Sequence, residues 1–202
     1  MNKLDTRALL LQAGTQIIRE KGFHHTGIQE ILQATGVPKG SFYHYFTSKE
    51  DFGLQMIEQE AAAHQRVLDA YLLDITYSPL TRLRRYFTDK REAFASLQCR
   101  EGCLLGNLGQ ELGDQLESFR CKLAEVFAQW RQQFAQCLAQ AQQQEEIPSN
   151  LNVSLLAEFC MSGWEGALLQ MKVSKSLEPI DAFISILFDH VLIKPGSGKR
   201  DP

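Results

Sequence analysis

Apolar residues recur along the chain at the three- and four-residue spacing of amphipathic helices. Near the N-terminus, Leu10, Ala13, Gly14 and Ile17 follow this spacing and predict a first helix over residues 5–21. A glycine directly after this stretch gives the helix an end. No stretch shows the sustained apolar–polar alternation that is typical of a strand. The pattern therefore predicts an all-α protein.

Two short helices joined by a brief turn are predicted next. Thr26 begins the first of them, because Thr26 and Gln29 have the spacing of a capping box, and Gly36 ends it. Pro38 then opens a helix over residues 38–46, since a helix tolerates proline best in its first turn. Two helices separated by a glycine-containing turn of about four residues form a helix-turn-helix motif.

The rest of the chain predicts a helical body, which brings the total to about nine helices. A second capping box, Thr47–Glu50, begins a long helix to about residue 73. The further helices are expected at about residues 79–98, within 101–114, and at 116–145, 152–173 and 179–193. We expect a helix-turn-helix domain at 1–50, a signal-sensing and dimerisation domain at 51–194, and a disordered tail at 195–202.

The helix over residues 38–46 has two unlike faces at about 100° per residue. Phe42, Tyr45 and Phe46 form its apolar side, which we expect to pack against the preceding helices. The outer side offers a cation, bare backbone, hydroxyls and an imidazole, which suit phosphates and base edges: Lys39, Gly40, Ser41, Tyr43 and His44. Thr26 and Lys49 stand at helix starts, where free N–H groups favour a phosphate. A helical hairpin with solvated polar residues is the alternative.

Composition and charge narrow the class of protein. Of the 202 residues, 44% are hydrophobic, which is enough for a core, and the net charge is -3. A general polyanion binder is usually strongly basic, so that class is disfavoured. Residues 1–50 nevertheless hold six Lys or Arg against four Asp or Glu, which fits a local nucleic-acid contact. The chain has neither a signal-peptide pattern nor an apolar run of ~18 residues, so we expect a cytoplasmic protein.

At this point the sequence resembles a known family. The run from Gly36 to Asp51, together with Gly22-Phe23 and Thr26 before Ile28, is similar to the signature of the TetR family of one-component regulators. The resemblance covers about residues 5–55. It implies a homodimeric repressor that binds palindromic operator DNA, with a recognition helix at 38–45 and the DNA contacts named above. It also implies release of the DNA by a chemical signal.

Two C-terminal segments carry a second resemblance. Residues 102–112 and 169–179 are similar to those of the electrophile-responsive family member that controls N-ethylmaleimide reductase. Cys103 follows Gly102 and is expected at a helix start, where a thiol pKa is lowered. We therefore consider Cys103 a thiol that electrophiles or oxidants modify, with Lys172 as its cationic neighbour. The alternative for Cys103 is an inert buried cysteine.

A second sensing mechanism is a small molecule bound among the helices of the body. The aromatic and aliphatic residues that could line such a pocket are Phe87, Phe94, Leu104, Leu108, Phe127, Trp130, Phe134, Phe159 and Trp164. Apolar lining and apolar core look alike in a sequence, so both interpretations stay open. Five cysteines at irregular spacing indicate reduced thiols, and we expect Cys121, Cys137 and Cys160 to be buried. We expect no metal and no cofactor.

The last two helices are apolar on more than one side, which predicts a four-helix dimer interface. The small and apolar residues on these helices are Leu155, Leu156, Phe159, Gly163, Gly166, Ala167, Phe183, Ile184, Leu187, Phe188 and Val191, and we expect one of their faces to meet a second subunit. Two rival functions remain. One is an enzyme with Cys103 as nucleophile and His64 or His190 as base, although no nucleophile-elbow motif is present. The other is a helical adaptor that does not touch DNA.

Overall fold

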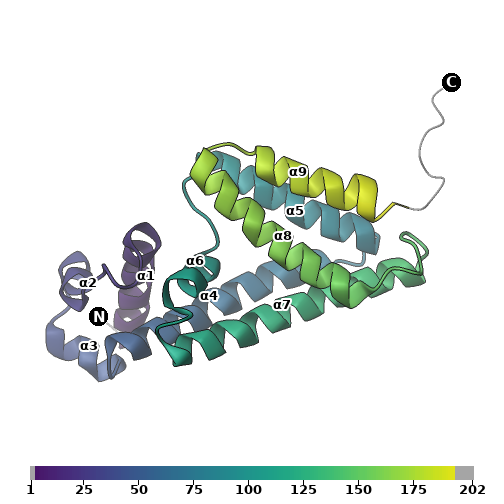
Figure 1. The fold of residues 1–202 in the computed structure, drawn as a ribbon. Coiled ribbons are helices and arrows are strands. Elements are labelled where there is room, and N and C mark those ends of the chain that lie inside the picture. The colour runs from purple at the N-terminus through teal and green to yellow at the C-terminus, as the bar shows by residue number, and fades with distance from the viewer. Residues whose placement is uncertain (1–2, 194–202) are drawn as a thin grey trace. The chain divides into compact units, whose positions relative to one another are not determined.

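The computed structural model describes residues 3–193, and all regular elements in this range are helical. Their bounds are α1 (Lys3–Lys21), α2 (Ile28–Thr35), α3 (Lys39–Tyr45), α4 (Lys49–Leu72), α5 (Pro79–Ser96), α6 (Leu104–Leu112), α7 (Glu117–Gln143), α8 (Val153–Ser174) and α9 (Glu178–Ile186) (Figure 1). A single π-helical turn, Leu187–Val191, follows α9. The predicted all-α class is confirmed. The tail expected at 195–202 lies outside the described residues.

The chain divides into two compact units. The first comprises the residues up to Ala63 together with Leu104–Glu125, and the second comprises His64–Cys103 and the residues from Val126 on. The helices α4 and α7 therefore contribute to both units, and α6 belongs to the first. The compact unit that contains the helix-turn-helix is therefore larger than the predicted domain at residues 1–50. The functional boundary near residue 50 stays a prediction.

The core of the first unit is built on aromatic rings from α3 and α4. Phe42 and Phe46 are fully buried, and the Phe52 ring lies 5.7 Å and 5.0 Å from theirs, centroid to centroid. Gly14 of α1 faces this cluster, because a Cβ added there would lie 2.4 Å from Cζ of Phe52. The first helix therefore needs a residue without a side chain where it crosses α4.

The structure corrects both predicted capping boxes. Thr26 is fully buried and its hydroxyl donates to the carbonyl of Gly22, 2.8 Å away, while Gly27 is the N-cap of α2. At the start of α4 the cap is one residue later than predicted. The Ser48 hydroxyl accepts from the Asp51 N–H at 3.0 Å, and the Asp51 carboxylate accepts from the Thr47 N–H at 2.7 Å. Either register fits the Thr-Ser pair, so only the structure distinguishes them.

The second unit packs α5, α8 and α9 side by side around an aromatic core (Figure 1). Phe87 is at its centre. The rings of Phe134, Trp164 and Phe183 lie 5.6 Å, 5.0 Å and 5.2 Å from the Phe87 ring, centroid to centroid. Each of these rings buries a large apolar area, which is the main stabilisation of such a core. Within the described residues, no helix has the length and apolarity needed to cross a membrane.

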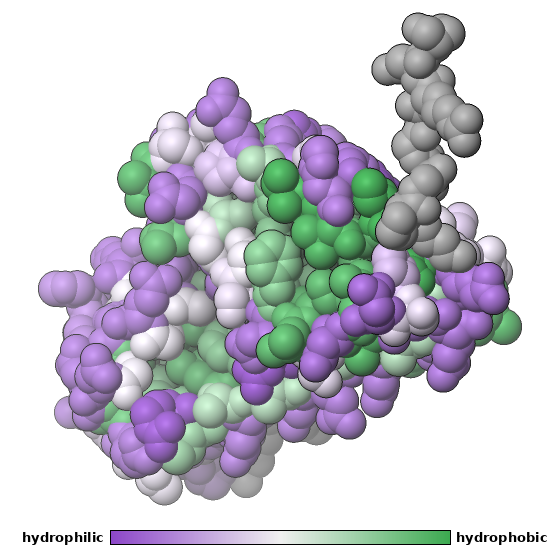
Figure 2. Space-filling model, turned by 45° about the vertical axis from the view of Figure 1, so that its right-hand side comes forward, coloured by the Kyte–Doolittle hydropathy of each residue, from purple (hydrophilic) through white to green (hydrophobic). Residues whose placement is uncertain are grey.

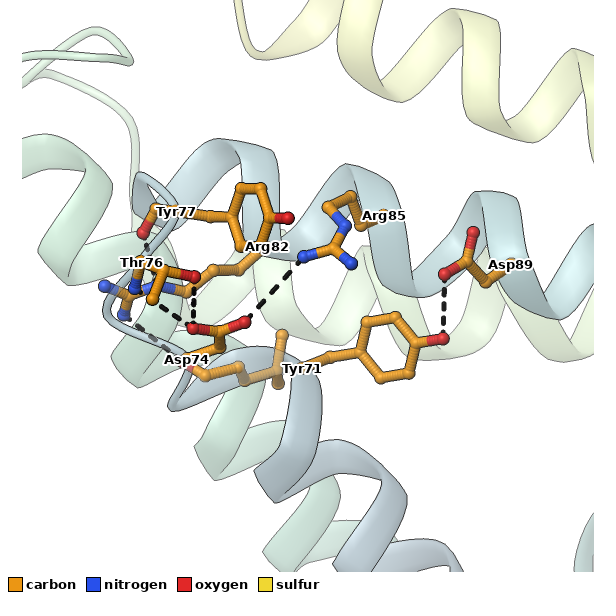
Figure 3. Close-up of polar contacts among 8 residues, drawn as sticks. Tyr71, Asp74, Thr76, Tyr77, Arg82, Arg85 and Asp89 are labelled. Carbon is orange, nitrogen blue, oxygen red and sulfur yellow. Dashed lines mark hydrogen bonds and ion pairs between the residues drawn. The ribbon is translucent and has the colours of Figure 1, made fainter.

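A buried arginine fixes the corner between α4 and α5 (Figure 3). Arg82 is 7% exposed, and its guanidinium donates to the carbonyls of Tyr77 and Leu72 at 2.7 Å and 3.3 Å. It also donates to Gln140 of α7 at 3.0 Å. These bonds satisfy carbonyls that a helix end and a loop leave free.

Candidate functional site

The outer edge of α3 is exposed as the sequence predicts. Lys39, Gly40 and His44 are exposed, Tyr43 is 48% exposed, and Ser41 is half-buried. The opposite face of α3 supplies Phe42 to the core. Five of the seven predicted DNA contacts therefore share one helix, and four of them are open to solvent. A cation, a phenol and an imidazole on a short helix match the groups that contact phosphates and base edges.

The other two predicted contacts have different surroundings. Lys49 is half-buried, and its Nζ lies 4.5 Å from the centre of the Phe23 ring and 3.4 Å from the carbonyl oxygen of His24. Burial lowers the pKa of Lys49, and the charge of Glu111 opposes that shift. The prediction for the Thr26 side chain is corrected. Its hydroxyl is buried and donates to the carbonyl of Gly22, so this side chain is not available to a phosphate.

Cys103 lies directly before α6, as the sequence predicts, and is half-buried. Its thiol is hydrogen-bonded to the carboxyl group of Glu165 on α8. Burial raises the pKa of Glu165, and the bond to Cys103 opposes this shift. Burial lowers the pKa of Lys90 on α5, and the interaction with Cys103 opposes that shift. The thiol therefore has an acidic and a basic neighbour in the second unit.

Sequence reasoning missed both of these neighbours. Glu165 carries a signal that could have revealed it, since it is an acidic residue within the mostly apolar α8. Lys90 carries no such signal, because α5 is rich in charged residues. The expected partner, Lys172, is half-buried on α8. It lies seven residues after Glu165, two helical turns away on the same face. Its role beside Cys103 stays a prediction.

A histidine and a tyrosine extend this polar cluster. The hydroxyl of Tyr86 lies 3.1 Å from Nε2 of His64, and the His64 ring lies 4.2 Å from the Trp130 ring, centroid to centroid. Burial, and to a smaller extent the charge of Lys90, lower the pKa of His64 to about 4. Burial is also the main cause of the raised pKa of Tyr86. Both groups are therefore neutral at physiological pH.

The predicted pocket residues have four different environments. Phe87, Trp130, Phe134 and Trp164 are buried in the core of the second unit. Phe94 and Phe127 are half-buried, and Phe159 is 44% exposed. Leu104 and Leu108 are buried in α6, which belongs to the first unit. A surface hollow of about 290 Å³ is lined by other residues: Leu80, Thr81, Arg84, Arg85, Thr88, Asp89 and Glu146. The effector pocket stays a prediction.

The cysteines differ in accessibility. Cys137 and Cys160 are buried as predicted, and burial raises the pKa of each to about 12. Cys121 is exposed, which corrects the prediction that it is buried. A hydrogen bond to Glu117 raises its pKa and so disfavours its thiolate. Among the described residues, no group of three His, Cys, Asp or Glu is placed to hold a metal ion.

The apolar residues of α8 and α9 divide between the core and the surface. One apolar side is buried within the second unit and includes Leu156, Ala167, Phe183, Leu187 and Phe188. Figure 2 shows hydrophobic side chains gathered on the face that α8 and α9 form. Large apolar residues that remain exposed on these helices are Leu155, Phe159, Leu169, Val173 and Ile186, at 41–73%.

Comparison with known proteins identifies two family regions. Residues 10–56 match the description "Bacterial regulatory proteins, tetR family", and residues 79–187 match "Tetracyclin repressor-like, C-terminal domain". The chain is 40% identical to the transcriptional regulator AcuR of Cereibacter sphaeroides over 185 residues, which cover 92% of this chain and 84% of AcuR. It is 35% identical to the transcriptional repressor DhaR of Mycobacterium sp. strain GP1 over 192 residues, 95% of each chain.

The resemblance of the C-terminal segments is also confirmed. The transcriptional repressor NemR of Escherichia coli is 32% identical over 177 residues, which cover 88% of this chain and 89% of NemR. The crystal structure of the reduced form of NemR superposes with a TM-score of 0.85, covering 95% of this chain and 99% of that one at 29% identity.

Proposed function

Because this chain belongs to the TetR family of transcriptional regulators and is a DNA-binding regulator, we propose that the exposed edge of α3 reads its operator. The observation that carries this proposal is the pairing of exposed Lys39, Tyr43 and His44 with buried Phe42 on one short helix. The buried face fixes the rotation of α3, so the polar face points outward. Gly40 is exposed, and a Cβ there would meet nothing within 4 Å, so the backbone is open to a groove.

A gel shift tests this proposal with the duplex upstream of the chain's own gene. Lys39→Ala and Tyr43→Ala should each weaken binding by about 1–3 kcal/mol, the typical size of a direct contact. If Lys39 contacts a phosphate, Lys39→Ala also reduces the slope of log affinity against log salt concentration by about one. The matched control is Arg66→Ala, which removes a positive charge from the exposed part of α4 in the second unit. Unchanged affinity in both α3 variants contradicts the proposal and indicates that another surface contacts the DNA.

The outward face of α8 is the proposed dimer interface. The exposed residues on this face are Leu155, Phe159, Gly166, Leu169 and Val173. Together with Ser162, they are separated by alternating steps of four and three residues. This spacing forms one continuous stripe on a helix, as in helices that pack against a partner helix. A twofold dimer would present two α3 edges to half-sites about 34 Å apart on one duplex.

Sedimentation or light scattering tests this interface. Leu169→Glu should give a monomer with sharply reduced operator affinity, because it places a charge in an apolar contact. The control Leu73→Glu changes a leucine that is 59% exposed elsewhere in the second unit, and it should stay dimeric. A dimeric Leu169→Glu variant places the interface on another surface.

Cys103 is the proposed sensor, and its modification is proposed to release the DNA. Support comes from its position before α6, its partial exposure, and its ionisable neighbours Glu165 and Lys90. We keep Lys172 as a second candidate cation. Adding a bulky or charged group to a half-buried thiol changes the packing around it, and this can shift the balance between two states of different DNA affinity.

The test compares operator release by quinones, aldehydes and hypochlorite in three proteins. The wild type and Cys121→Ser should release the duplex, and Cys103→Ser should not. If Cys103→Ser still releases it, the thiol mechanism is wrong and a ligand bound among the aromatic residues of the second unit is favoured. A sensor consumes about one equivalent of electrophile per subunit, whereas continued turnover would favour an enzyme.

A further inference from the structure

The turn between α1 and α2 is bound by a carboxylate that is distant in the sequence. Oε2 of Glu111 accepts from the backbone N–H of Phe23 at 2.9 Å, and Oε1 accepts from the N–H of His24 at 2.7 Å. Glu111 lies on α6, and all three residues belong to the first unit. Two consecutive N–H groups after a left-handed residue form a concave anion site, and a carboxylate has two oxygens to fill it.

Gly22 makes room for this contact. Its φ of +85° is a left-handed conformation that favours glycine, and it ends α1. A Cβ added at Gly22 would lie 3.0 Å from Oε2 of Glu111. The end of α1 by itself already favours glycine at position 22. The structure adds a second reason, which is the close approach of the carboxylate.

The same turn contacts Lys49, one of the proposed DNA contacts. The Phe23 ring lies 5.0 Å from the Phe119 ring, centroid to centroid, and the ammonium group of Lys49 also packs on the Phe23 ring. The carbonyl oxygen of His24 accepts from Lys49, and the His24 ring is hydrogen-bonded to Gln115 at 2.7 Å. Moving the turn would therefore move Lys49 and the start of α2.

We propose that Glu111 is a positioning residue for operator binding, because its carboxylate fixes the turn from which α2 begins and against which Lys49 packs. The proposal rests on the proposed DNA-binding role of α3 and Lys49. Glu111 touches no base or phosphate in this role. It also gives a function to the segment 102–112 beyond Cys103, since α6 begins directly after that cysteine and carries Glu111 near its end.

The test variant is Glu111→Gln, which keeps the size of the side chain. In either orientation its amide group turns an NH₂ toward one of the two backbone N–H groups, so one hydrogen bond is lost. We expect operator affinity to fall about tenfold, the loss typical of one charge-assisted bond. The exchange of the Phe23 and His24 amide hydrogens should accelerate by about the same factor.

The matched control is Asp114→Asn, which removes the same charge from an exposed position two residues beyond α6. Simple electrostatics predicts that losing a negative charge strengthens DNA binding in both variants. The proposal predicts opposite directions: weaker binding for Glu111→Gln, and equal or tighter binding for Asp114→Asn. The far-UV circular dichroism of Glu111→Gln, compared with that of the wild type, reports whether the variant is still folded.

A measurement on the wild type avoids dependence on any variant. If Glu111 binds both N–H groups, the amide hydrogens of Phe23 and His24 exchange with solvent much more slowly than those of an unstructured chain. Rapid exchange at both residues, or equal operator affinity of Glu111→Gln and wild type, overturns the proposal. If the wild type binds the upstream duplex no better than a scrambled duplex, the proposed DNA site fails instead, and the amide exchange still decides whether the carboxylate holds the turn.

Discussion

The Tyr86 hydroxyl and Nε2 of His64 lie 3.1 Å apart in the second unit, and the surroundings keep the imidazole neutral. Burial is the main cause of the lowered pKa of His64, which falls from 6.5 to about 4. Lys90 links this pair to Cys103, because its charge acts on both His64 and the thiol. The pair therefore has measurable consequences for stability.

Stability should fall as the pH is lowered from 6.5 toward 4. In this window the unfolded chain protonates His64 while the folded protein does not, so the unfolded state binds more protons. The free energy of unfolding is expected to drop by about 2 kcal/mol between pH 7 and pH 5 from this residue alone. Urea unfolding at the two pH values measures it. His64→Gln should remove this part of the pH dependence, and His25→Gln, which changes an exposed histidine, should keep it.

The two ionisable neighbours of Cys103 should change its reactivity in opposite directions. A nearby cation favours a thiolate and a nearby carboxylate disfavours it, so Lys90→Met should slow alkylation and Glu165→Gln should speed it. We expect changes of about three- to tenfold in the alkylation rate at pH 7. Mass spectrometry of the iodoacetamide adduct at Cys103 measures the rate in a Cys121→Ser background. Changes of the same sign in both variants would indicate altered packing instead.

Loss of the buried arginine should destabilise the second unit. Arg82→Met keeps much of the volume but leaves the carbonyls of Leu72 and Tyr77 without their donors, which should cost about 3 kcal/mol of unfolding free energy. Arg84→Met on the same helix is the control. Arg84 is exposed and pairs with Asp189 at 2.6 Å, so its loss should cost less than about 1 kcal/mol. Equal midpoints for the two variants in urea would contradict the role given to Arg82.

An added methyl group at Gly14 should be unfavourable despite the better helix propensity of alanine. The new Cβ would lie 2.4 Å from Cζ of the Phe52 ring. We expect a net loss of about 1–2 kcal/mol, because overpacking outweighs the gain of about 1 kcal/mol in propensity. Gly109→Ala in α6 is the control, since its Cβ would meet only Leu123 at 4.0 Å and should be neutral or stabilising. Thermal unfolding of both variants separates packing from propensity.

Much of the fold was predictable, because helical periodicity is a local property. The spacing of apolar residues gave each helix to within a few residues, and the two faces of α3 followed from its own sequence. The position of Cys103 before α6 was predictable for the same reason, since Gly102 separates two helical patterns. These features depend on residues that are neighbours in the chain.

The sequence by itself determined the all-α class, the helix-turn-helix and the solvent-facing edge of Lys39, Gly40, Tyr43 and His44. Only the tertiary structure decided what each polar side chain meets: Thr26 is buried, Cys121 is exposed, and Glu111 binds a turn nearly 90 residues away in the chain. The physical reason is that periodicity specifies which side of a helix is apolar, whereas a hydrogen bond or a pKa depends on groups that packing brings together from distant elements.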